Sequence, residues 1–146
     1  MQLTIRETGV DKVERRFKVF GERLADPRPA LRLALDKIED ANYQRIETGK
    51  GIRRDTKATT ARKKREGSDL TPLRESGALL ASMRRGGRGN IFKVYRTVGR
   101  YGTDLPHAHL QFTRKTVKAR RVVTIQKTTR QKAKLAVRDE LFEPMR

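Results

Sequence analysis

The chain has 146 residues and a formal net charge of +19, with 35% hydrophobic and 36% charged residues. This length predicts one domain over 1–146, but the hydrophobic fraction is below the usual ~45–50% and predicts a small core. The absence of Cys excludes a disulfide framework and a thiolate metal site, and is typical of assembly in a reducing cytoplasm. No run approaches the ~20 apolar residues of a membrane span, and the N-terminus lacks the apolar segment of a secretory signal.

The positive charge is unevenly distributed. The first 48 residues are nearly balanced, so almost all of the excess lies after them, and no acidic residue occurs between Asp104 and Asp139. Such a polarised charge repels itself unless a partner neutralises it. The sequence therefore predicts an acidic partner, either nucleic acid or the acidic surface of a protein.

The N-terminal third is predicted to be helical after a short strand over residues 2–6, where apolar and polar side chains alternate. Thr8 to Asp11 has the spacing of a helix start, and Asp26-Pro27 is a second start signal. Gly49 or Gly51 is expected to end the second helix. Residues at steps of three and four, apolar except for Asn42, predict a stripe on each helix that packs in the core: Val10, Val13, Phe17, Phe20 and Leu24, then Leu31, Leu35, Ile38, Asn42 and Ile46.

The segment from Arg53 to Met83 joins this helical half to the rest of the chain. Its first part, Arg53 to Arg65, is basic and Thr-rich, so we expect a loop that tightens into a helical turn over Thr60 to Glu66. The apolar run from Leu73 to Met83 needs a surface to pack on, and bulk at Gly77 is expected to spoil that packing. Two segments are expected to be extended or flexible within the domain: 49–72 and 84–90.

The remaining chain alternates strand and turn signals before a last helix. Strands are predicted over Ile91 to Val98, Ala108 to Phe112 and Val122 to Ile125, with a bend between the first two marked by Gly99, Gly102 and Pro106. Thr128 or Thr129 is expected to cap a helix that ends near Leu141, with Ala133, Ala136, Val137 and Leu141 on its inner face. The predicted class is α+β, with N-terminal helices, a small antiparallel sheet and a C-terminal helix.

Catalytic and metal-binding patterns are weak in this sequence. His107 and His109 would share one face of a strand, but the chain has no other His and no Cys to complete a metal site. Ser76 and Ser82 lack the setting of an activated nucleophile. We therefore expect no enzyme, metal or cofactor, and a nuclease that uses the two histidines, abolished by His107→Ala, is a minor alternative.

Basic clusters are the strongest functional signal, because phosphate or carboxylate partners would neutralise them. Aromatic residues amount to only 5% of the chain, which argues against specific reading of single strands. Two interpretations of the basic clusters remain: non-specific contact with a nucleic-acid backbone, or pairing with acidic protein surfaces. The candidate anion-contact residues are Arg53, Arg54, Arg62, Lys63, Lys64, Arg65, Arg84, Arg85, Arg114, Lys115, Lys118, Arg120 and Arg121.

Over residues 43–126 the chain resembles the tail-completion, or virion morphogenesis, family of tailed bacteriophages. The order of several short motifs carries the resemblance: Thr60 with Lys63 or Lys64, Pro72-Leu73, Ser76-Gly77-Ala78-Leu79, Ser82-Met83, Val98-Gly99, His107-Ala108-His109 and Gln111-Phe112. The resemblance implies packing roles for Thr60, Leu73, Gly77, Leu79 and Ser82.

The resemblance further implies a structural virion protein at the head–tail junction, assembled in the host cytoplasm and without catalysis. It implies a homo-oligomeric ring, sixfold symmetry being one arrangement, beside neck, connector or tail-terminator proteins. The positive half would contact acidic neighbouring proteins or line the channel for phage DNA, away from any membrane. The alternative is a free, basic nucleic-acid-binding protein of ribosomal or nucleoid type.

Overall fold

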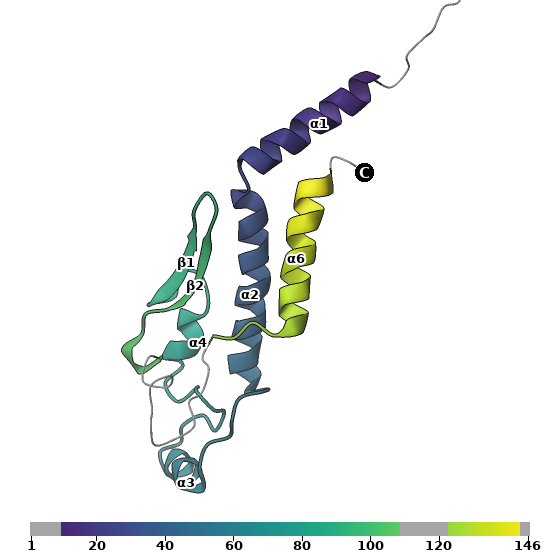
Figure 1. The fold of residues 1–146 in the computed structure, drawn as a ribbon. Coiled ribbons are helices and arrows are strands. Elements are labelled where there is room, and N and C mark those ends of the chain that lie inside the picture. The colour runs from purple at the N-terminus through teal and green to yellow at the C-terminus, as the bar shows by residue number, and fades with distance from the viewer. Residues whose placement is uncertain (1–9, 109–122, 144–146) are drawn as a thin grey trace, which may run out of the picture.

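A computed structural model describes residues 10–108 and 123–143 (Figure 1). The predicted α+β class, with N-terminal helices, an antiparallel hairpin and a C-terminal helix, is confirmed. The strand predicted over residues 2–6 lies outside the described residues. The elements in chain order are α1 (Val10–Ala25), α2 (Arg28–Thr48), α3 (Lys57–Arg65), α4 (Ala78–Ser82), β1 (Asn90–Val94), β2 (Gly99–Thr103) and α6 (Lys127–Phe142).

Helix α2 runs through the middle of the molecule, with α6 along one side and the hairpin on the other (Figure 1). It begins at Arg28, whose backbone N–H donates to the Asp26 carboxylate at 3.2 Å. It ends as predicted at Gly49, which adopts the left-handed conformation (φ 67°) that favours glycine at a helix end.

The approach to α6 differs from the predicted strand. Residues 123–125 form no strand, because the backbone N–H of Thr124 donates to the buried side-chain oxygen of Asn42 on α2 at 2.9 Å. The helix then starts at Lys127, before the predicted cap at Thr128 or Thr129. Its inner face is as expected: Ala133 is buried, and Ala136, Val137 and Leu141 are partly buried.

The strands of the hairpin differ in extent from the sequence prediction. The first strand stops at Val94, and the turn that follows is closed by a hydrogen bond from Tyr95 N to Val98 O at 2.8 Å. The second strand occupies Gly99–Thr103, where a bend was predicted from the glycines. A Cβ atom at Gly99 would lie 3.0 Å from the Leu35 side chain, so this glycine lets the strand approach α2 closely.

The core is small and lies beside the C-terminal half of α2. Its buried apolar members are Ile46, Ile52, Leu79, Met83 and Ala108. Tyr101 on β2 reaches across this core, and its hydroxyl donates to the Met83 carbonyl at 2.9 Å. Burial raises the pKa of this hydroxyl far above its ordinary value.

Helix α1 departs most from the expected core packing. It projects beyond the end of α2 and touches the rest of the chain mainly at the end of α6 (Figure 1). There the rings of Phe20 and Phe142 lie 5.2 Å apart. Three further residues of its predicted apolar stripe face solvent: Val13 is 51%, Phe17 57% and Leu24 52% exposed. The local pattern is amphipathic, but the described part of the chain covers this stripe only around Phe20.

None of the helices in the described ranges combines the length and the apolar character required to cross a membrane.

Candidate anion-contact surface

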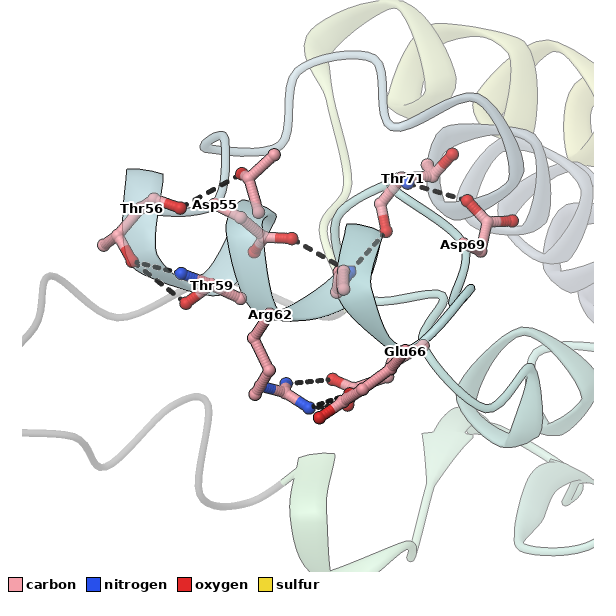
Figure 2. A network of polar contacts seen from close by, with 10 residues as sticks. Asp55, Thr56, Thr59, Arg62, Glu66, Asp69 and Thr71 are labelled. Atoms are coloured by element: carbon pink, nitrogen blue, oxygen red, sulfur yellow. Dashed lines mark hydrogen bonds and ion pairs between the residues drawn. The ribbon is translucent and has the colours of Figure 1, made fainter.

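Helix α3 carries the most basic run of the chain. The sequence predicted a single turn over Thr60 to Glu66, but the helix begins at Lys57, inside a segment expected to be extended. Thr56 caps it, since its hydroxyl accepts a hydrogen bond from the Thr59 N–H at 3.2 Å (Figure 2). This cap lies outside the predicted turn, and it adds most of a turn to the helix.

Lys63 is not an anion-contact residue. Its side chain is 3% exposed, and its ammonium group lies 2.9 Å from the Asp55 carboxylate, whose side chain is 5% exposed. The same ammonium donates to the Thr71 carbonyl at 3.1 Å. These contacts join the two ends of the segment around α3 (Figure 2), so Lys63 acts in folding and is closed to an external anion.

Arg62 is partly exposed, but its guanidinium group is already paired with carboxylates of its own chain. One guanidinium nitrogen donates to Glu66 at 2.6 Å, and the group forms a two-nitrogen contact with Glu75 at 2.7 and 3.0 Å (Figure 2). The hydrogen bond from Arg62 lowers the pKa of Glu75. Of the run 62–65, the exposed Lys64 and Arg65 therefore remain candidate anion-contact residues.

Arg84 and Arg85 fasten the turn after α4 to α2. Arg84 contacts Asp40 at 2.6 Å, while Arg85 contacts Asp36 at 2.7 Å and the buried Glu39 at 3.0 Å. Their guanidinium groups also lie over aromatic rings, 4.1 Å and 4.2 Å from the ring centroids. The two arginines thus hold the fold together, and residues 84–90 are ordered turns where the sequence suggested a flexible connection.

The other candidate cations fall into two groups. Arg53 and Arg54 are exposed in the loop after the buried Ile52. The basic loop lies outside the described residues: Arg114, Lys115, Lys118, Arg120 and Arg121.

The five packing candidates differ in their surroundings. Leu79 and Ser82 are buried on α4, and the Ser82 hydroxyl donates to the Leu79 carbonyl at 2.8 Å. The Thr60 hydroxyl donates to the Thr56 carbonyl at 3.0 Å. Leu73 packs on the core with φ 67°, a rare conformation for a residue with a side chain.

Gly77 needs a different explanation from the predicted crowding. A Cβ atom there would meet no other atom within 4 Å, but its φ of 72° lies in the left-handed region. Substitution is therefore unfavourable because of the backbone conformation and not because of bulk.

The hairpin presents a cationic face that sequence reasoning missed. Lys93 and Arg100 face each other in the register of β1 and β2, and both are exposed. Neither has an ion-pair partner among the residues that the structure describes. One signal was available: no Asp or Glu occurs between Ser76 and Thr103.

Of the strand predicted over Ala108 to Phe112, only Ala108 lies within the described residues, and it is helical. Residues 106–108 are helical, because the turn after β2 leads into Pro106, which is compatible with a first helical position. His107 is exposed, and His109 lies outside the described residues. Within the described ranges, no three His, Asp or Glu side chains gather as metal ligands would.

Among the described candidate cations, Arg62, Lys63, Arg84 and Arg85 therefore pair with carboxylates of the same chain, while Lys64 and Arg65 are exposed. Comparison of the chain with protein-family models, with curated proteins and with solved structures found no match.

Proposed function

We propose that this chain is a structural subunit of a tailed-bacteriophage virion, a ring-forming neck or tail-completion protein that joins head and tail. The observation that carries the proposal is the exposed apolar stripe of α1. Burying Val, Phe or Leu side chains contributes about 1.5–3 kcal/mol each, so a helix that leaves three of them half exposed favours association.

A second copy of the chain is the proposed partner of this stripe. A groove of about 580 Å³ lies between α2 and α6, and its lining includes Ala41, Leu135 and Ala136 together with the charged Asp40 and Lys132. Leu135 is partly exposed there and offers an apolar contact. Helix α1 points away from the body of its own chain (Figure 1), so it would fill the groove of a neighbour.

A contact between α1 of one chain and the groove of the next can be repeated around a ring. The donor helix and the acceptor groove are different surfaces of one chain, so each subunit can donate to one neighbour and accept from another, whereas two chains that exchange helices mutually would form a pair. The small core and the polarised charge suit a subunit that its neighbours complete. The motif resemblance over residues 43–126 supports a place in the particle between head and tail.

Native mass spectrometry and light scattering of the purified protein test the assembly. We expect a closed oligomer that Phe17→Gln dissociates, because the substitution removes the central ring of the exposed stripe. Lys18→Gln is the matched control, since this exposed residue of α1 lies outside the apolar stripe. A monomeric wild-type protein, or equal assembly of both variants, would contradict the proposed interface.

The position in the particle needs a separate test. Mass spectrometry of purified virions should detect the chain, and imaging should place a tag on it at the head–tail junction. Absence of the chain from intact virions would end the proposal of a neck subunit.

The free nucleic-acid-binding protein remains the second candidate, favoured by the exposed cations of α3 and of the hairpin. It requires tight binding of nucleic acid by the monomer with steep salt dependence. A neck subunit instead requires assembly, with DNA held loosely and without base reading.

A further inference from the structure

The hairpin formed by β1 and β2 has two unlike faces. Phe92 and Val94 share the inner face with Tyr101, which reaches the core, and with Gly99, which lies against α2. The cross-strand pair Lys93 and Arg100 belongs to the opposite, outer face. The two faces follow from the alternation of side chains along each strand.

The outer pair is unfavourable for the isolated fold. Like charges directly opposite each other destabilise paired strands, and no carboxylate of the described chain pairs with either side chain. The Arg100 guanidinium lies 5.6 Å from the centroid of the Tyr95 ring, which orients the group without neutralising it. By contrast, Arg84 and Arg85 a few residues earlier are both paired with carboxylates of α2.

Arg96 extends the cationic face into the turn. It is exposed, and its charge adds to the hydrogen bonds from Arg28 in lowering the pKa of Asp26. That carboxylate is already held by Arg28 at 2.6 and 2.7 Å. Arg96 is therefore available to an external anion.

We propose that the outer face of this hairpin, through Lys93, Arg96 and Arg100, contacts the phosphate backbone of double-stranded DNA. A protein partner would require an apolar centre in the interface. The apolar groups beside these cations are the partly buried Ile91 and the Tyr95 ring, beside which the Arg100 guanidinium lies. Phosphate contacts need no such centre and no base reading. The inference deepens the proposed function, and rests on it for the source of the DNA, since a channel subunit would hold passing DNA by charge.

The test is fluorescence anisotropy of a labelled, mixed-sequence DNA duplex with the full chain, across about 50–200 mM salt. The variant is Lys93→Gln with Arg100→Gln. Its control is Arg130→Gln with Lys134→Gln, which removes the same two charges from exposed positions of α6. The hairpin variant should reduce the slope of log affinity against log salt by about two, while the control leaves it near the wild-type value.

Thermal unfolding separates a lost contact from a lost fold. Removing two opposed like charges should leave the Tm of the hairpin variant unchanged or higher, although its DNA affinity falls. Equal affinity and slope for wild type and hairpin variant would overturn the proposal, as would an equal loss in the control. Tighter binding of poly-glutamate than of DNA at the same salt would overturn it in favour of an acidic protein.

Native mass spectrometry of the same samples keeps this inference apart from the proposed function. A hairpin variant that assembles normally but has lost the two phosphate contacts is the expected result. A monomeric wild type that shows the hairpin-dependent slope would support the DNA contact while the ring fails. If the wild type assembles but the hairpin variant binds DNA with the same affinity and salt slope, the result would support the ring and overturn the DNA contact.

Discussion

Replacing Lys63 by Met should destabilise the protein strongly, although the side chain at this position of α3 keeps nearly the same size and shape. The substitution removes the ammonium group that lies 2.9 Å from Asp55 and 3.1 Å from the Thr71 carbonyl. Both side chains of the ion pair are almost fully buried, so water cannot replace the lost cation without opening the segment.

The expected cost follows from this burial. Breaking a buried ion pair by removing one partner costs about 3–5 kcal/mol, against about 5–15 kcal/mol for the whole stability of a domain. For a chain of this size, that loss corresponds to a decrease in Tm of about 10–20 °C. The companion variant, Lys63→Met with Asp55→Asn, removes both charges and should recover much of the loss, because no uncompensated charge then remains buried.

Urea unfolding followed by circular dichroism measures the free energies of unfolding. Lys64→Met is the matched control, since it makes the same change at the adjacent exposed position and should stay within about 0.5 kcal/mol of wild type. If Lys63→Met costs no more than Lys64→Met, the buried pair does not stabilise this segment and the reasoning is wrong.

Two further predictions concern the same joint of the chain. The hydrogen bonds that Glu75 and Asp69 accept lower the pKa of each carboxyl below its ordinary value of 4.5 and 3.8, respectively. The two carboxylates therefore stabilise the fold above those values, and this stabilisation is lost as the pH falls through and below them. A Tm that stays constant from pH 6 to about pH 3 would contradict this prediction. Gly77→Val should cost about 1–2 kcal/mol because of the positive φ, and Gly77→Asn should cost less, since Asn tolerates this conformation; equal unfolding free energies for the two variants would point to another cause.

Local signals in the sequence were sufficient for the class and for most helices. The apolar steps along α2 and the glycine at its end predicted its span, and the inner face of α6 followed from the same periodicity. These features act over one or two turns of chain, so neighbouring residues contain the information. The charge excess and the lack of Cys are likewise properties of the sequence alone.

The hairpin register depended on packing against α2. Like any glycine, Gly99 predicts a turn in the sequence. It lies in a strand instead, because a residue without a side chain fits against Leu35. The same limit applies to α1, whose amphipathic pattern predicts an apolar stripe but not whether the fold supplies a partner. The sequence alone could therefore not predict that Phe17 would remain exposed.

Tertiary structure alone decided which cations are free. Lys63 and Lys64 are adjacent in one basic run, but only Lys63 turns inward to meet Asp55. Arg85 is neutralised by Glu39, 46 residues earlier, whereas Lys93 receives no such partner in the described chain. A run of like charge is visible in a sequence, but its neutralisation depends on carboxylates that only folding brings within reach.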